Sequence, residues 1–557
     1  MKKLLKTLLI VVGIIVVLYG ALWIWVLIPS PDFDPYTYEP VQPDYWPTDG
    51  FRRSTPEEQG MDSEKLLEIH DFYAEEHAKS SDNAIDAISI YRNGYLVADY
   101  YFSPLYPRET PHIIHSVTKS IMSALIGIAI EQGYIESVDV PFVEFFPDKQ
   151  VAITDEQMRE ITLKDLLSME TGMRSRDFAM NRWEGLFAMQ ETDDWVSYIL
   201  GLPVDAEPGL RYDYSNMSSF LLSAIIEEAT GMDTLDFARE NLFDPLGIDE
   251  VQWEWSPQGY AIGYARMWLL PEDMAKFGLL YLQQGQWDGK QIIPVDWVHE
   301  SITPHAFPKN YVELLDANGE VDQQVSSTNW QRATFVHPFS DGYGYQWWLN
   351  KDGSYAAIGV SGQYIMVFPK ENLLVVVNNA SQGLGVFFPR KIVDKYVLPA
   401  IKSDAAIAAN NAAYQELLAL AGPPTLDVQA QPVGELPSIA EEISGVTYSL
   451  ESNKWNYDNF KLVFAPDKDY AEFSYTAKVS DEVMFQVGLD GVYRFSETPI
   501  GSFAAHGSWI YPNSFEINYQ QVGYSAPAKF VLIFEGQSIT VEESGLVGTY
   551  TYSGTIK

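Results

Sequence analysis

The sequence predicts an α+β fold, in which an antiparallel sheet carries packed helices and a helical subdomain, followed by a C-terminal all-β domain. Three observations support this fold class. A hairpin pattern at 87–101, turned by Asn93-Gly94, precedes a long region of helical periodicity. Strand-like runs return at 343–377. Beyond residue 438, short runs of Tyr, Phe and Val alternate with turn residues, which is typical of a β-sandwich or a small β-barrel.

The length of the chain, 557 residues, is too great for a single hydrophobic core, so several domains are expected. Segment 1–28 is predicted to be a membrane anchor, and the Pro-rich segment 29–56 an extended tether. The α+β domain is placed at 57–400, a helix with a linker at 401–437, and the all-β domain at 438–557.

The N-terminus has the pattern of a single-pass anchor in the cell membrane. Lys2, Lys3 and Lys6 precede the 21 uncharged residues from Leu8 to Ile28. A helix of that length spans the hydrocarbon layer of about 30 Å. A cleaved signal peptide would have a shorter apolar run and small residues at its exit. Lysines before the span predict that the rest of the chain is extracytoplasmic.

Helices are predicted where apolar residues recur at helical spacing next to start or stop signals. Residues 61–77 show a broad apolar face, and Pro271 begins a further helical segment. The segment from His115 places Ser and Thr before an apolar run, as at the start of a buried helix. The predicted helices lie at 61–77, from 115 onward, and at 161–172, 220–229, 271–283 and 401–420.

Strands are predicted from short runs of β-branched and aromatic residues between turn residues. In the α+β domain they lie at 87–101, 343–349, 355–359, 364–368 and 373–377. In the C-terminal domain they lie at 460–464, 471–475, 483–487, 515–519 and 530–534. The C-terminal domain shows no catalytic constellation, so we expect an accessory or interaction module, and no motif in it identifies a partner.

The composition excludes several classes of function. The net charge of −40, from 76 acidic and 36 basic residues, argues against nucleic acid as a partner, because its phosphates would be repelled. The absence of cysteine excludes disulfides, cysteine nucleophiles and thiolate metal sites. The eight histidines show no ligand spacing, so neither a metal nor another cofactor is expected.

One pair of residues suggests nucleophilic catalysis. Ser116 and Lys119 are three residues apart, so on a helix their side chains lie on one face and within reach of each other. A serine hydroxyl is a poor nucleophile until a base takes its proton, and an amine whose pKa is lowered by burial can help to do so. A capped helix with an exposed lysine would show the same pattern, so the pair alone decides nothing.

Five motifs occur in order between Thr55 and Pro399. They are Ser116-Val117-Thr118-Lys119, Leu163 to Gly172, Pro208-Gly209 followed by Tyr214-Ser215-Asn216, Pro271 to Gly278, and Gly359-Val360-Ser361-Gly362-Gln363. Together they resemble the serine β-lactamase and penicillin-binding-protein family, on its class C β-lactamase, DD-peptidase and esterase side. The resemblance covers more than half of the chain and implies a β-lactamase/transpeptidase-like fold.

The resemblance also implies how the nucleophile is activated. Ser116 would be acylated and Lys119 would be its partner in proton handling. Tyr214 would be the base or relay, with a phenolate that a nearby ammonium stabilises. Tyr212 is a rival base, and Tyr214 could instead be a core aromatic residue.

The remaining implied roles concern the substrate. Asn216 would bind both Lys119 and an amide of the substrate, although it could instead be a helix cap. Gly359 would let the substrate approach the strand, and the backbone amides of Ser116 and Val360 would hold the oxyanion.

The third motif departs from the family pattern. Ala357-Ile358-Gly359 stands where the family has Lys-Thr-Gly or His-x-Gly. In the lactamases and peptidases that cation meets the substrate carboxylate. Unless an arginine elsewhere replaces it, its loss favours an ester or an amide without that carboxylate, as in the esterases and the 6-aminohexanoate-dimer hydrolases of the family. The Gly-x-x-Gly-Gln run most resembles the latter.

Two further pairs of side chains allow a catalytic or a structural interpretation. His112 and His115 flank the nucleophile and suggest a Ser-His triad, but no Gly-x-Ser-x-Gly elbow surrounds Ser116, so a structural role is favoured. Trp347 and Trp348 fit a substrate cleft and core packing equally well.

We therefore predict a membrane-anchored extracytoplasmic serine hydrolase that cleaves an ester or amide through an acyl-enzyme on Ser116. Its substrate would be a small or peptide-like molecule. One alternative is a β-lactamase or DD-peptidase acting on cell-wall-type substrates. The other is a non-catalytic binding protein that retains the fold and works through its C-terminal domain.

Overall fold

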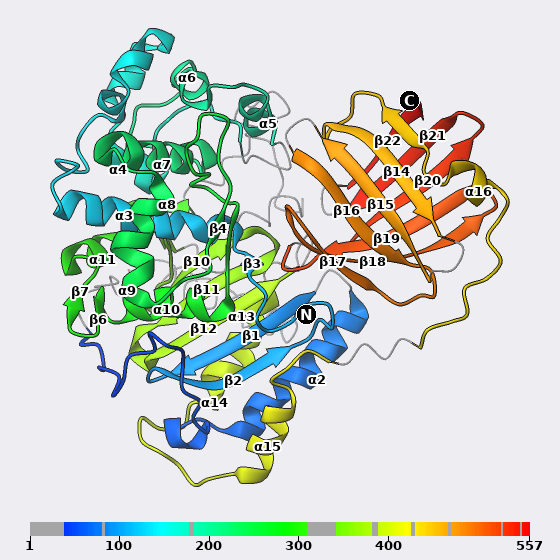
Figure 1. Cartoon of the computed structure of the whole chain (residues 1–557). Coiled ribbons are helices and arrows are strands. Elements are labelled where there is room, and N and C mark those ends of the chain that lie inside the picture. The colour runs from blue at the N-terminus through cyan, green and yellow to red at the C-terminus, as the bar shows by residue number, and fades with distance from the viewer. Residues whose placement is uncertain are drawn as a thin grey trace, which may run out of the picture.

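The computed structural model in Figure 1 describes residues 38–557, except for 81–83, 178–182, 309–340, 381–387, 425–428, 466–468, 478–479, 525–526 and 546–547. The predicted anchor at 1–28 lies outside the described residues. Among the residues that are described, no helix is both long enough and apolar enough to cross a bilayer.

A seven-stranded antiparallel sheet forms the centre of the α+β domain (Figure 1). The predicted hairpin turns at Asn93 and Gly94, which both have positive φ, and the predicted meander supplies the strands beside it. In spatial order the strands are β2 (Tyr95–Tyr101), β1 (Ile85–Arg92), β12 (Leu373–Asn379), β11 (Gln363–Phe368), β10 (Tyr355–Gly359), β9 (Trp348–Leu349) and β8 (Gly342–Tyr343). Four of the inner strands, β1, β12, β11 and β10, are buried along their whole length, because helices cover both faces of the sheet.

Helices from the two ends of the domain cover one face of this sheet. They are α2 (Ser63–Lys79), α13 (Phe388–Ile392), α14 (Leu398–Ala400) and α15 (Asn411–Ala419). Their apolar side chains, such as Phe72 and Ile392, share a core with Ile88 and Val375 of the sheet.

The opposite face carries the nucleophile helix and the helical subdomain, which lies above the sheet in Figure 1. α3 (Thr118–Glu131) and α7 (Asn216–Thr230) pack against each other, and α10 (Pro271–Leu282) packs on β11 and β12. The other helices of this region are α4 (Leu163–Ser168), α5 (Glu184–Gln190), α6 (Trp195–Leu200), α8 (Thr234–Ala238), α9 (Asp244–Leu246) and α11 (Val295–Ser301). Two small sheets pair β3 (His112–Ile113) and β4 (Gln252–Trp253) with β5 (Met267–Leu269), and β6 (Gln286–Trp287) with β7 (Lys290–Gln291).

The C-terminal domain is a closed β-barrel, which decides between the two predicted all-β architectures. A parallel pairing between Gly488 of β16 and His506 of β18 closes the ten-stranded sheet. Alternating apolar residues point inward and form one core of mostly aromatic side chains. A short helix, α16 (Ile439–Ile443), precedes the strands. These are β13 (Thr447–Leu450), β14 (Tyr457–Phe464), β15 (Tyr470–Ala477), β16 (Ser480–Gly488), β17 (Arg494–Thr498), β18 (Gly501–Tyr511), β19 (Ser514–Gln521), β20 (Ala528–Glu535), β21 (Ser538–Gly545) and β22 (Gly548–Ile556).

The described part of the predicted tether, residues 38–56, is not a free spacer. This segment is extended but lies against the α+β domain. The Tyr38 hydroxyl donates to the carbonyl of Leu282 at 2.8 Å, and the Trp287 indole donates to Thr48 at 3.0 Å. The rings of Trp46 and Trp287 are 5.2 Å apart. Aromatic residues in a Pro-rich segment bury apolar area when they dock, which a free spacer would leave in water.

The helix predicted at 401–420 is shorter than expected, because only 411–419 is helical. The preceding residues are held by other backbone partners. The amide of Lys402 donates to the carbonyl of Gly60, and the buried guanidinium of Arg92 donates to the carbonyl of Ser403 at 2.8 Å. The side chain of Asn410 then accepts from the amide of Ala413 and caps the helix.

Candidate active site

The predicted nucleophile, Ser116, lies in a short turn between β3 and α3. The turn, His115–Val117, is a single 3-10 turn that leads directly into the helix. His115 has a positive φ of 46°, a strained conformation for a residue with a side chain. The amide of Ile114 donates to the carbonyl of Met267 at 2.9 Å, which ties the turn to β5. Ser116 is partly exposed at the end of this turn, while its neighbours are buried.

Lys119 is buried directly beneath the serine. Its Nζ donates to Ser116 Oγ at 3.0 Å, to Asn216 Oδ1 at 2.8 Å and to the carbonyl oxygen of Tyr264 at 2.9 Å. Only 1% of Lys119 is exposed, so these three oxygens replace water around the amine. The exposed lysine of the structural alternative is therefore excluded.

Burial also changes the protonation of Lys119. It lowers the pKa of this amine to about 7, although the carboxylate of Asp177 opposes the shift. Two of the amine's three contacts are to neutral oxygens, of Asn216 and Tyr264, which accept a hydrogen bond from either the ammonium or the free amine. The carboxylate of Asp177 does not contact the amine directly. At neutral pH a large fraction of Lys119 is therefore the free amine, which can accept a proton from the serine.

Tyr214 contacts the same pair from the segment just before α7. Its hydroxyl forms a hydrogen bond with Ser116, and Lys119 Nζ lies 4.9 Å from the centre of its ring. Burial raises the pKa of Tyr214, and the hydrogen bond from the serine only partly offsets this effect. A phenolate stabilised by the nearby ammonium, as the sequence predicted, is therefore not supported. The geometry fits Tyr214 as a neutral relay, with Lys119 as the base.

The rival tyrosine does not take part in this cluster. Burial raises the pKa of Tyr212 well above its usual value, and its hydroxyl has no partner among the described residues. Its ring packs edge-on against Tyr343 at 5.3 Å. Tyr212 is therefore a packing residue, and Tyr214 is the phenol that meets Ser116.

Asn216 binds Lys119 as expected, and it is not the helix cap. The cap of α7 is Ser215, whose hydroxyl accepts from the amide of Ser218. The amide nitrogen of Asn216 is directed at the carbonyl of Asp177 at 3.4 Å. Contact with a substrate amide, the second predicted role of Asn216, stays a prediction.

The structure shows a packing reason for Gly359, while its predicted role in admitting the substrate stays a prediction. A Cβ on this residue would lie 2.5 Å from the carbonyl oxygen of Ile114 and 3.0 Å from the Cβ of His115. Gly359 thus lets β10 pass close to the turn of the nucleophile. The next residue, Val360, is 40% exposed beside that turn, a placement that suits the predicted pairing of its amide with that of Ser116.

Ala357 occupies the position of the missing cation. It lies on β10 opposite Ile365 and is fully buried in the core on the helical face of the sheet. Its methyl group offers no charge to a substrate, so this strand contributes no cationic contact at that position.

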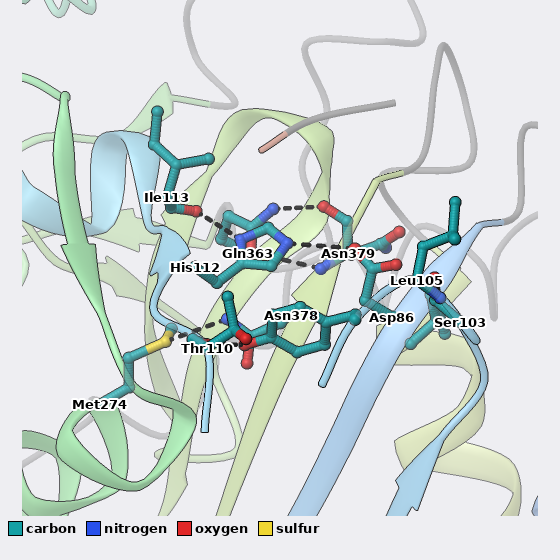
Figure 2. Close-up of polar contacts among 12 residues, drawn as sticks. Asp86, Ser103, Leu105, Thr110, His112, Ile113, Met274, Gln363, Asn378 and Asn379 are labelled. Atoms are coloured by element: carbon teal, nitrogen blue, oxygen red, sulfur yellow. Dashed lines mark hydrogen bonds and ion pairs between the residues drawn. The ribbon is translucent and has the colours of Figure 1, made fainter. Parts of the chain in front are cut away.

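The two histidines flanking the nucleophile are structural, as predicted. Figure 2 shows the His112 ring between the carbonyl of Ile113 and the carboxylate of Asp86, at 2.8 Å and 3.1 Å. Both ring nitrogens are therefore engaged away from Ser116. Burial, with the charge of Arg266, lowers the pKa of His115 to about 3, so this ring is neutral.

The two tryptophans have different environments. Trp347 is fully buried, and its ring lies 4.4 Å from that of Tyr281, so it belongs to the core. Trp348 is half-buried and stacks on Tyr214 at 5.7 Å. Of the two, only Trp348 lies beside the candidate site.

Sequence reasoning missed Asp177, which lies behind Lys119 and Asn216. Its buried carboxylate accepts from the amide of Met217 at 2.8 Å and from the hydroxyls of Ser175 and Ser215 at 3.0 and 3.1 Å. These contacts hold the segment before α7 in place, and the negative charge favours the ammonium form of Lys119. Asp177 belongs to none of the five motifs, so no local signal identified it.

Among the residues that are described, no three His, Asp or Glu side chains are grouped so that they could hold a metal ion. The chemistry available at this site is that of the serine, the amine and the phenol.

A model of the family described as Beta-lactamase matches residues 76–391, more than half of the chain. The chain belongs to the Beta-lactamase family. A 6-aminohexanoate-dimer hydrolase from Paenarthrobacter ureafaciens is 22% identical over 306 residues, covering 52% of this chain and 71% of that protein. A lovastatin esterase from Penicillium rubens is 28% identical over 112 residues, covering 19% of this chain and 28% of the esterase. The structure of a penicillin-binding protein homologue from Pyrococcus abyssi covers 88% of this chain and 100% of its own, at 15% identity and a TM-score of 0.45.

The pKa of Lys119 predicts how the labelling rate of Ser116 in this Beta-lactamase-family site depends on pH. The rate at which a fluorophosphonate labels Ser116 should fall about tenfold per pH unit below pH 7, because the pKa of Lys119 is about 7 and protonation removes the base. Asp177→Asn removes the carboxylate that favours the ammonium, so the midpoint of the profile should move to lower pH.

Asp148→Asn removes the same charge from an exposed position and is the matched control. Its midpoint should coincide with that of the wild type. A midpoint that rises in Asp177→Asn, or that stays near 10 in the wild type, would contradict the assignment of Lys119 as the base.

Proposed function

We propose that this protein is a serine hydrolase that cleaves an ester or amide through an acyl-enzyme on Ser116. The observation that carries the proposal is the 3.0 Å contact between Ser116 Oγ and the buried amine of Lys119. Burial holds the pKa of that amine at about 7, in the range where a general base is effective at neutral pH. Membership of the Beta-lactamase family supports the same assignment.

The geometry supports a two-step reaction. The neutral amine of Lys119 takes the proton of Ser116 Oγ, directly or through the hydroxyl of Tyr214, while Oγ bonds to the substrate carbonyl carbon. The carbonyl oxygen becomes an oxyanion, which the amides of Ser116 and Val360 would hold. Collapse breaks the bond to the leaving alcohol or amine, which receives the proton held by Lys119. Water then attacks the acyl-enzyme, with Lys119 again as base, and releases the acid and the free serine.

The absence of a cation at position 357 of β10 narrows the substrate class. With buried Ala357 in place of a cation, an ester or amide is a better candidate than a β-lactam or a cell-wall peptide. The relatives described as a 6-aminohexanoate-dimer hydrolase and a lovastatin esterase support this preference. A β-lactamase or DD-peptidase remains the alternative within the family.

Labelling tests whether the site is catalytic. The folded full-length protein should react with a fluorophosphonate probe, and peptide mapping should place the adduct on Ser116. Ser116→Ala should lose the adduct, whereas Ser137→Ala, a serine outside the site, should keep it. Tyr214→Phe should slow labelling by about 10²–10⁴-fold, because it removes a proton relay. A folded wild-type protein that does not react would favour the non-catalytic binding protein.

Turnover separates the two enzymatic alternatives. We expect hydrolysis of short-chain p-nitrophenyl esters that depends on Ser116, with nitrocefin turned over at least about tenfold more slowly. Nitrocefin turnover faster than that of every ester tested would instead identify a β-lactamase.

We propose further that residues 8–28 anchor the protein in the cell membrane as a single pass, with the catalytic domain extracytoplasmic. The proposal depends on the length and the apolar character of that run and on the lysines before it. The full chain should stay in the membrane pellet after alkaline carbonate extraction, and a protease added outside intact cells should digest the catalytic domain. Release into the carbonate supernatant would refute the anchor.

A further inference from the structure

The β-barrel touches the catalytic domain next to the nucleophile. The carbonyl of Gly523, in the connection after β19, accepts from the amide of Ile113 at 2.6 Å, three residues before Ser116. Gly523 has a φ of 69°, and a Cβ there would lie 2.2 Å from the carbonyl oxygen of Pro111. Only glycine permits this approach. The contact is therefore built into both domains.

Apolar packing supports the same contact. Side chains of the β1–β2 hairpin and the loop after it share a small core with two barrel residues. This core consists of Ala87, Tyr101, Leu105, Tyr106, Ala504 and Val522. Val522 directly precedes Gly523, so both this apolar core and the hydrogen bond to Gly523 hold the connection after β19 against the catalytic domain.

The residue after Gly523 is Tyr524, which reaches the edge of the candidate site. Its hydroxyl accepts from Arg266 Nη1 at 3.2 Å. Its ring meets the His115 ring edge-on at 6.1 Å and stacks on the Trp268 ring at 6.4 Å, with the two planes 29° apart. His115 is the neighbour of Ser116, so one barrel side chain contacts the turn of the nucleophile and a cation at the same time.

Arg266 lies on the segment that lines the other side of the catalytic pair. Two residues before it, the carbonyl of Tyr264 accepts from Lys119 Nζ, and one residue after it, the carbonyl of Met267 accepts from the amide of Ile114. Arg266 itself has a φ of 60°, a costly conformation that persists where neighbouring contacts impose it. Its positive charge helps to lower the pKa of His115. The guanidinium thus lies near His115, the residue before the nucleophile.

The guanidinium still has donors available. Its side chain is 39% exposed, and its two polar partners, Tyr524 at 3.2 Å and Glu254 at 3.6 Å, both contact Nη1. Nε and Nη2 have no partner among the described residues. The pair with Glu254 is long and half-exposed, so it holds the guanidinium weakly. Adjacent N–H groups of one guanidinium match the two oxygens of a carboxylate.

We propose that Arg266, oriented by Tyr524 of the β-barrel, binds a carboxylate carried by the substrate beside the scissile ester or amide. This inference rests on the proposed hydrolase function and makes the barrel part of the active site. Arg266 lies on the segment before β5 and not on β10, so it does not restore the cation of the third motif at Ala357, and the preference for an ester or amide over a β-lactam stands. The net charge of −40 opposes an anionic ligand at long range, but that field is screened beyond about 8 Å in physiological salt, and the direct contact decides binding.

Two esters test the proposal in the full-length protein. One is neutral, p-nitrophenyl butyrate, and the other carries a free carboxylate, mono-p-nitrophenyl glutarate. The readout is the ratio of kcat/KM for the acidic ester to that for the neutral one. Arg266→Gln should lower this ratio about 10–100-fold, mainly through KM, as expected for loss of hydrogen bonds to a charged group. Arg266→Lys should recover part of the loss, and Tyr524→Phe should lower the ratio by a smaller factor.

Arg159→Gln is the matched control, because Arg159 has a side chain that is 40% exposed and forms one ion pair, with Glu156. Its ratio should equal that of the wild type. Equal ratios in Arg266→Gln and Arg159→Gln would overturn the role of Arg266, and an unchanged ratio in Tyr524→Phe would overturn that of the barrel. If Ser116-dependent hydrolysis of the neutral ester persists in those cases, only this inference fails. If the wild type cleaves neither ester and Ser116 is not labelled, the proposed function fails with it.

Discussion

The burial of one amine is the constraint on which the rest of the site depends. Lys119 lies at the start of a helix most of whose residues are buried, and only 1% of its own surface is exposed to water. Three oxygens, from Ser116, Asn216 and the backbone of Tyr264, take the place of that water. Each comes from a different part of the chain. The positions of α3, α7 and the segment before β5 are therefore fixed relative to one another by the need to satisfy this single group.

The same burial assigns the chemical roles. It lowers the pKa of Lys119 and raises that of Tyr214, so the amine is neutral enough to act as a base while the phenol keeps its proton. Asp177 opposes the shift of the lysine without touching it, which keeps the pKa near 7 instead of lower. When the environments of two titratable groups move their pKa values in opposite directions, the acid and base roles can be assigned to them.

Most of the fold and part of the site followed from sequence. Strands 355–359 and 364–368, the Asn93-Gly94 hairpin and the helix starting at Pro271 all depend on local patterning, and all are found where expected. Ser116 and Lys119 were predictable because helical spacing alone puts them together. Tyr214 and Asn216 were predictable only through the family motifs, because their contact with Lys119 spans a long stretch of chain.

The rest depended on packing that no local pattern encodes. The Pro-rich segment is extended as predicted, but its docking depends on distant partners such as Trp287. Burial raises the pKa of Tyr214 and so does not favour the predicted phenolate, because a motif names the groups at a site without revealing how dry the site is. Asp177, Arg266 and Tyr524 belong to no motif, and Tyr524 comes from a domain that was expected to be separate. Only the three-dimensional arrangement brings them to the nucleophile.

The most direct test of this account is a measurement of the pKa of Lys119 itself. In protein labelled with ¹³C at the lysine Cε positions, the resonance that disappears in Lys119→Met can be followed as the pH is varied. The account predicts a midpoint near 7, with the amine neutral above it. A midpoint near the ordinary lysine value of about 10.4 would show that the amine is solvated and charged, and would contradict the role of Lys119 as the general base.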